Sequence, residues 1–278
     1  MMTTTMITPM GISIKVFRFL LIANIFYIWI LNETTAMKNI VTFLFVFTVM
    51  LGNAQQKLVP GDKSIETRWI KDESYSMKWY TVRDTVKFEI ARVVTTIDAG
   101  KDKLNVYTDV QIRNAKTQWV DTTIVALPSL KPVRHASYNL EREVVVNYGK
   151  KISGHQEIKQ AQKKTPIDET SNETFFDGSF YPYVIRLLPL QEGYTKDISI
   201  YNFNPGKSSV LTASVKSVHS AIYKSKKGKA DVWEVIVTDE MGNGVLNSVT
   251  YYIGKSDRKL YKQLFKNNGQ NMMMELVE

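Results

Sequence analysis

The chain has 278 residues, a formal net charge of +9 and no cysteine. The lack of cysteine excludes disulfides, thiol catalysis, cysteine zinc sites and the lipid-bearing cysteine of a bacterial lipoprotein. The positive charge is scattered through turns and strand faces, as in KSKKGK, without a long basic block, which argues against nucleic-acid binding.

Residues 37–54 have the three parts of a secretory signal peptide in order. Lys38 supplies the charge, residues 40–51 the apolar core, and Gly52 and Ala54 the small residues before Gln55. This core is shorter than the roughly 20 apolar residues of a membrane-spanning helix. We therefore predict cleavage after Ala54 and export of the remaining chain.

A second short apolar run, residues 19–31, follows Lys15 and Arg18. Either residues 1–36 are an upstream extension or extra hydrophobic segment before the true start at Met37, or the two runs form a membrane hairpin that anchors the chain through residues 12–51. The first interpretation is favoured because each run is short for a span and Met37 begins a complete signal. The predicted organisation is residues 1–36 as extension, 37–54 as signal peptide and 55–278 as one β-rich domain that does not span a membrane.

From Thr85 onward, apolar and polar residues alternate with period two, which is typical of half-buried strands. The alternation predicts a hairpin that turns at residues 98–102, and a third strand over 119–127 that ends at Pro128 and Pro132. Two further strands are predicted over 133–140 and 143–148. The polar stretch 159–174 is predicted to be a loop.

The segment FFDGSFYPYVIRLLPL interrupts this alternation. Phe180, Val184 and Leu188 recur at helical spacing, Asp177 or Ser179 can begin a helix, and Pro189 ends it. Strands are then predicted over 198–203, 210–216, 217–224, from 232, and over 245–254, 259–266 and 272–277. Roughly ten antiparallel strands with one short helix predict a mainly β protein, a large curved sheet or open half-barrel with the helix on its concave side.

The segments KPVRHASYN, NYGKKISG, FFDGSFYPYVIRLLPLQEG, VWEV and TYYIGKSDRKLYK occur in this order. They resemble an uncharacterised family of Gram-negative envelope proteins, domain of unknown function 3108, over residues 131–278, while residues 55–130 fit by strand pattern. The family is similar in architecture to the lipoprotein-localisation factors, unclosed β-barrels wrapped over helices. The resemblance implies that fold, export to the periplasm or outer envelope of a Gram-negative bacterium, and binding of an acyl chain or other apolar ligand in the half-barrel. The single clear helix departs from the carrier proteins.

Two groups of residues are candidates for ligand binding. Apolar side chains where helix and sheet meet form either the core or a ligand-lining wall, and they are Phe176, Phe180, Tyr183, Leu187, Leu188 and Trp233. The basic residues Lys131, Arg134 and Arg142 are either solvated strand ends or a cluster that meets a phosphate head group or an acidic partner.

Catalytic and metal-binding patterns are weak. His135, His155 and His219 lack metal-ligand spacing, and no GxSxG motif is present. The acid pairs at 168–169 and 239–240 are predicted to lie in exposed polar turns, where their pKa values have no reason to shift. We therefore predict no catalytic residue, no metal and no cofactor.

Three functions remain open at this point. The first is a non-catalytic envelope module that binds or carries an acyl chain or other apolar ligand. The second is a structural or protein-interaction module of the envelope with a filled core. The third and least favoured is a hydrolase, which needs a buried carboxylate or serine pair.

Overall fold

The computed structural model describes residues 56–277 except 116–117, 205–207, 226, 243–244 and 268–269. A boundary between compact units falls between Gln55 and Gln56, and the strands and helices that follow all lie in the second unit. The predicted extension and signal peptide lie outside the described residues, and that division of the chain stays a prediction. None of the helices in the described ranges has the length and apolar character needed to cross a membrane.

Fifteen strands form a single open sheet in the order β8-β7-β6-β5-β4-β3-β2-β1-β15-β14-β13-β12-β11-β10-β9. The first eight are β1 Glu73–Arg83, β2 Val86–Ala99, β3 Lys103–Ile112, β4 Gln118–Ala126, β5 Lys131–Tyr138, β6 Arg142–Tyr148, β7 Ile152–Ile158 and β8 Lys163–Glu169. The others are β9 Phe176–Asp177, β10 Lys196–Asn202, β11 Ser209–Ser225, β12 Gly228–Gly242, β13 Val245–Gly254, β14 Leu260–Asn267 and β15 Gln270–Leu276. A short 3-10 helix, η1, spans Thr67–Trp69, and the α-helix α3 spans Tyr181–Arg186.

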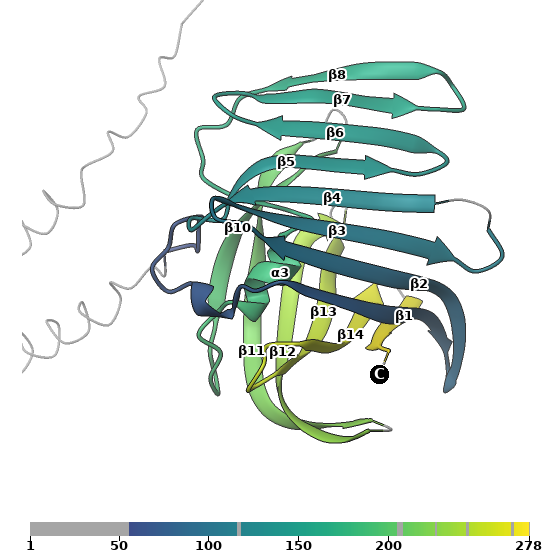
Figure 1. Cartoon of the computed structure of the whole chain (residues 1–278), viewed down its shortest axis with the longest axis vertical. Coiled ribbons are helices and arrows are strands. Elements are labelled where there is room, and N and C mark those ends of the chain that lie inside the picture. The colour runs from purple at the N-terminus through teal and green to yellow at the C-terminus, as the bar shows by residue number, and fades with distance from the viewer. Residues whose placement is uncertain are drawn as a thin grey trace, which may run out of the picture. The chain divides into compact units, whose positions relative to one another are not determined.

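The connectivity requires this sheet to curl. The two edge strands, β8 and β9, are consecutive in the chain and are joined only by residues 170–175. A flat sheet of fifteen strands spaced about 4.8 Å apart would hold its edges about 67 Å apart. The connecting chain reaches no further than about 25 Å when fully extended. The edges must therefore approach each other, and Figure 1 shows β1–β8 crossing β10–β14 with α3 between them.

The helix fills the concave side of the curled sheet. Val184 and Ile185 of α3 are fully buried in one apolar cluster. That cluster takes in Ile97, Leu104 and Val125 from β2–β4 and Ile198, Val215 and Val235 from β10–β12. Burying each such side chain contributes about 1.5–3 kcal/mol. The prediction of a large open β-sheet with one short helix on its concave side is confirmed.

The structure has more strands than the sequence pattern predicts. Roughly ten were expected, whereas the sheet has fifteen, and β1 and β7 were not among those expected. The predicted loop at 159–174 was wrong, because it contains β8. As an edge strand, β8 buries only Ile167, so its residues are mostly polar, and Pro166 is tolerated there.

Two smaller expectations were also wrong. Pro132 was expected to end a ladder but lies inside β5, paired with Val125 at a register shift. The strands expected at 210–216 and 217–224 are one long strand, β11, with a shift between Val215 and Ser217. In both places an irregular register accommodates what looked like a break. The predicted hairpin over β2 and β3 is confirmed.

Candidate seam site

The two halves of the sheet meet along a seam between β5 and β9, where side chains rather than a backbone ladder make the contacts. The β4–β5 register places Thr123 opposite His135 and Asp121 opposite Ser137. His135 Nδ1 lies 3.0 Å from Thr123 Oγ1 and 3.8 Å from Oδ1 of Asp177 in β9. The seam therefore brings an imidazole from one half of the sheet against a carboxylate from the other.

Asp177 is the most heavily engaged side chain of the seam and is almost fully buried. Tyr148 Oη donates to Asp177 Oδ2 at 2.5 Å, and the N–H groups of Ser179 and Phe180 donate to Oδ1 at 2.8 and 3.1 Å. Burial, together with the neighbouring Asp177 carboxylate, raises the pKa of Tyr148 well above its usual value. The phenol therefore stays protonated and remains a donor.

Two of these hydrogen bonds, from the N–H groups of Ser179 and Phe180, lie in the turn just before α3. Asp177 or Ser179 was predicted to begin the helix, and Asp177 does organise the turn ahead of it. The residue at the N-cap position is Phe180, which makes no side-chain hydrogen bond there. The carboxylate thus holds together the edge strand, the helix entry and β6.

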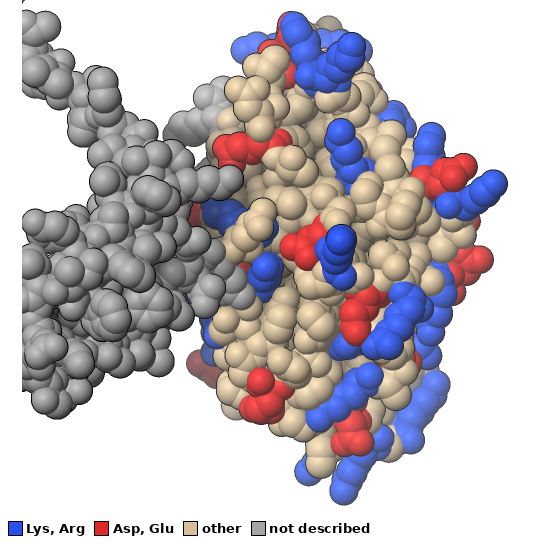
Figure 2. Space-filling view, turned by 90° about the vertical axis from the view of Figure 1, so that its left-hand side faces the viewer, with Lys and Arg blue, Asp and Glu red and all other residues tan. Residues whose placement is uncertain are grey.

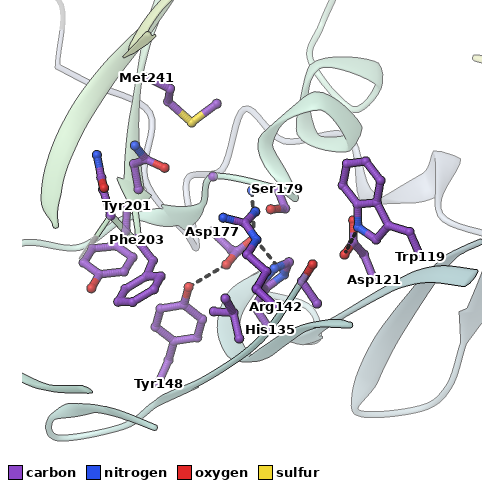
Figure 3. A pocket seen from close by; sticks show the side chains of 15 residues that line it. Trp119, Asp121, His135, Arg142, Tyr148, Asp177, Ser179, Tyr201, Phe203 and Met241 are labelled. Atoms are coloured by element: carbon purple, nitrogen blue, oxygen red, sulfur yellow. Dashed lines mark hydrogen bonds and ion pairs between the residues drawn. The ribbon is translucent and has the colours of Figure 1, made fainter. Parts of the chain in front are cut away.

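A cavity of about 420 Å³ opens at this seam, and we call it the seam pocket. It is lined by side chains of β4, β5, β6, β9, β10 and β12 and the residues that follow β9 and β10. The lining residues are Trp119, Asp121, His135, Ser137, Arg142, Val144, Tyr148, Asp177, Gly178, Ser179, Tyr201, Asn202, Phe203, Asn204 and Met241. Figure 3 shows Trp119 on one side of the pocket and Tyr148, Tyr201 and Phe203 on the other. The lining combines hydrogen-bonding groups with aromatic rings.

Arg142 is the cation of this pocket that is free to act on a ligand. It begins β6, is exposed, and its guanidinium has no hydrogen-bond or ion-pair partner among the residues that the structure describes. Figure 3 draws it between Trp119 and Tyr148. By contrast, the pocket's carboxylates are engaged, since Asp121 accepts from Trp119 Nε1 at 2.9 Å and Asp177 accepts as described above. A free guanidinium is a strong ligand for a carboxylate or phosphate.

A second cavity of about 300 Å³ shares Tyr148 with the seam pocket, and we call it the lysine pocket. It lies between the start of β5, the β6–β7 turn and the segment that leads into β9. Its lining comprises Pro60, Ser129, Lys131, Pro132, Tyr148, Gly149, Lys150, Lys151, Ile152, Ser171, Asn172, Glu173, Thr174 and Phe175.

The apolar residues predicted as a core or a ligand wall lie in the main hydrophobic core. Phe176, Phe180, Tyr183, Leu187 and Leu188 are all buried members of that cluster. Trp233 packs against its edge while half-exposed, with Lys255 Nζ 4.1 Å from the ring centroid. The structure thus brings these six together as packing residues, and their binding of a ligand stays a prediction.

The predicted basic cluster does not converge on one point. Lys131 lines the lysine pocket and Arg142 the seam pocket. Arg134 and His135 are neighbours in β5 and so face opposite sides of the sheet, and Arg134 Nη2 lies 3.5 Å from Tyr138 Oη. On the face shown in Figure 2, Lys and Arg side chains are likewise spread out, with Asp and Glu between them.

Several site residues were missed or misplaced by the sequence. The acid pairs at 168–169 and 239–240 lie in β8 and β12 rather than in turns. Asp239 is buried and accepts from Tyr181 Oη at 2.5 Å and Asn247 Nδ2 at 2.8 Å. Trp119 and Asp121 share the period-two face of buried Val125, which is a signal that they face the interior. Nothing in the sequence indicates that β9 lies opposite them.

The three histidines lie on separate strands and have different partners. His155 Nε2 lies 2.9 Å from Glu143 Oε1, and His219 Nδ1 lies 2.8 Å from Glu192 Oε1. Over the described ranges, no three His, Cys, Asp or Glu side chains are grouped so that they could hold a metal ion.

These features define an open half-barrel: one curled sheet, a helix filling its concave side and a polar pocket at the seam. The chain belongs to the family described as "Protein of unknown function (DUF3108)", whose model matches residues 74–276. The match includes β1–β4, beyond the residues that carry the resemblance in the sequence.

A β-barrel-like protein of domain of unknown function DUF1849 from Brucella abortus is 12% identical, with 80% of this chain and 97% of that chain covered and a TM-score of 0.46. No curated protein matches the chain.

Proposed function

We propose that this protein is an exported, non-catalytic binding module of the cell envelope that holds an acidic, hydroxyl-rich ligand, such as an acidic sugar, in the seam pocket. One observation carries the proposal. Arg142 lines a cavity of about 420 Å³ and has no partner for its guanidinium in the described part of the chain. Binding an acidic group would satisfy donors that the protein itself leaves to water.

The rest of the lining suits the same class of ligand. Ser137, Asn202 and Ser179 offer hydroxyl and amide groups that can both donate to and accept from ligand hydroxyls. The rings of Trp119 and Phe203 offer flat apolar surfaces against which the C–H face of a sugar ring can pack. A pocket with a few placed polar groups among aromatic rings is the usual form of a small-ligand site.

The acyl-chain version of the function has less support. The apolar side chains expected to line a cavity are closely packed in the core, where Phe176 and Leu188 are fully buried. This filled interior favours the alternative of a structural or protein-interaction module instead. The two alternatives differ in whether the seam pocket retains a ligand.

A hydrolase remains the third alternative, because the seam pocket contains Asp121, His135 and Asp177. General acid–base catalysis requires a carboxyl group that can exchange a proton with the substrate. Asp177 already accepts three hydrogen bonds and Asp121 accepts one from an indole. We therefore propose that the pocket binds its ligand without turning it over.

Native mass spectrometry tests the proposal. The purified protein would be incubated with a digest of bacterial envelope polysaccharides and its adducts weighed. The wild type should retain acidic sugars, the Arg142→Ala variant should lose them, and Arg83→Ala, which alters an exposed arginine outside the pocket, should retain them. Equal retention by both variants, or no adduct on the wild type, would contradict the proposal. Release of shortened products would favour the hydrolase.

Export is tested separately by N-terminal sequencing of the protein isolated from cells. We expect the mature chain to begin at Gln55 and to be recovered from the periplasmic or outer-envelope fraction. A chain that begins at Met1 and stays with the inner membrane would favour the anchored alternative through residues 12–51.

A further inference from the structure

The lysine pocket concentrates positive charge that the protein does not neutralise. Lys131 and Lys150 line it, both are exposed, and neither ammonium group has a hydrogen-bond or ion-pair partner among the described residues. Lys151 lines it too but pairs with Asp168 at 3.0 Å. The single carboxylate of the lining is Glu173, which is exposed.

These lysines are held on defined backbone rather than on a long loop. Lys150 lies in the tight turn between β6 and β7, which is closed by a 3.0 Å hydrogen bond from Gly149 N–H to the carbonyl oxygen of Lys151. Lys131 is the first residue of β5, which belongs to the same sheet. Because Lys131 and Lys150 line one cavity of about 300 Å³, their like charges are near each other, which is unfavourable unless an anion lies between them.

One side of the pocket is apolar and well packed. Phe175 stacks on Tyr201 with ring centroids 5.0 Å apart and meets Tyr148 edge-on at 6.0 Å. Pro132, which is buried, also lines the cavity. The pocket therefore offers cations together with a firm surface for the organic part of a ligand.

We propose that the lysine pocket binds the phosphate group of an organic phosphate. Lysine ammonium groups act as point charges that suit a phosphate, and a phosphate monoester carries −1.5 to −2 charges near pH 7, so it matches two free ammonium groups better than a carboxylate does. A phosphate monoester occurs in phosphorylated sugars and in the head group of phosphatidic acid. This inference does not depend on whether the seam pocket is occupied.

Calorimetric titration of the whole protein with glucose 6-phosphate tests the soluble source. We expect the affinity to fall about tenfold or more in the Lys131→Ala/Lys150→Ala variant, because each charge-assisted hydrogen bond is strong. The affinity should rise in Glu173→Gln, which removes the repelling carboxylate. It should change less than about twofold in Lys216→Ala, an exposed lysine elsewhere, and in Arg142→Ala of the seam pocket.

Flotation with vesicles that contain phosphatidic acid, compared with phosphatidylcholine vesicles, tests the lipid source with the same variants. Binding of either probe that depends on Lys131 and Lys150 supports the proposal and identifies the source. The proposal is overturned if neither probe binds, if the double variant binds as the wild type does, or if Lys216→Ala weakens binding equally. Loss in Arg142→Ala alone would assign the phosphate to the seam pocket instead. All five substitutions are at exposed side chains, and a thermal unfolding scan of each of the four variants checks that it is folded.

Discussion

Asp177 is the residue on which the seam depends most. Its carboxylate is buried and accepts hydrogen bonds from Tyr148 of β6 and from two backbone N–H groups at the helix entry. A buried carboxylate is costly unless its lone pairs are satisfied. The sequence marks Asp177 only as a helix-start residue, because the partner that arrives from β6 is 29 positions away.

Replacing Tyr148 by phenylalanine removes one of these donors. We expect Tyr148→Phe to lower the free energy of unfolding by about 1–3 kcal/mol, since a buried acceptor is left short of a partner. Urea unfolding measures the change. Tyr107→Phe is the matched control, because Tyr107 is 42% exposed and should shift the midpoint little. Equal effects of the two changes would contradict this account of the seam.

The raised pKa values of two buried tyrosines lead us to expect a loss of stability at alkaline pH. Burial raises the pKa of Tyr183 to about 12; the charge of Arg186 lowers this pKa, while Glu73 and Tyr75 raise it. Burial, together with the charge of Asp62, raises the pKa of Tyr194 to about 12. Because folding favours the protonated phenols, their contribution is complete below about pH 10, the unfolded pKa, and is lost as pH rises towards 12.

The measurement is the tyrosinate absorbance as a function of pH, together with urea unfolding at pH 9, 10 and 11. Tyr183→Phe and Tyr194→Phe should each remove a late-titrating component from the absorbance curve. The expectation fails if all the tyrosines titrate together near pH 10 or if stability stays constant across this range.

At the scale of the element, β9 is a two-residue strand whose position depends on the glycine after it. Gly178 N–H donates to the carbonyl oxygen of Tyr201 at 2.9 Å. A Cβ at this position would lie 2.8 Å from the same oxygen and 3.1 Å from Met241 Sδ. Gly178 can therefore approach the Tyr201 carbonyl oxygen of β10 this closely only because glycine has no side chain.

We expect Gly178→Ala to destabilise the protein by about 1–3 kcal/mol and to increase amide exchange in β9, because the overlap with a backbone oxygen displaces the strand. Hydrogen exchange followed by mass spectrometry measures this. Gly149→Ala is the control, since its Cβ would lie at an ordinary 3.6 Å from the carbonyl oxygen of Lys151. Unchanged exchange at β9 in Gly178→Ala would argue against the close approach.

The stability of the whole sheet depends on α3, because the helix packs against strands from both halves of the sheet. The first and last strands, β1 and β15, pair at the middle of the sheet, with Met77 opposite Leu276, so both free edges come from the middle of the chain. The curl that this connectivity imposes leaves an apolar interior that the helix must fill. Loosening the helix should therefore weaken both halves together.

Ile185→Ala tests this dependence. Ile185 is fully buried in α3, so truncation leaves a cavity and should cost about 2–5 kcal/mol. Ile222→Ala removes the same atoms from a side chain that is 59% exposed and should cost far less. Urea unfolding monitored by tryptophan fluorescence compares the two. Two separate transitions in Ile185→Ala, one for each half, would show that the sheet does not unfold as one unit.

The sequence by itself determined the mainly β class, the hairpin over β2 and β3, and the short helix before Pro189. Those features rest on local signals: period-two alternation, turn residues and helical spacing. The sequence did not predict edge strand β8, because most of its residues are exposed and show little alternation of apolar and polar side chains. Only the tertiary structure decided that β9 lies against β5, that Asp177 meets His135 and Tyr148, and that Lys131 and Arg142 line different pockets. The physical reason is that these contacts depend on the curl of the sheet, which the order of all fifteen strands imposes and no local pattern records.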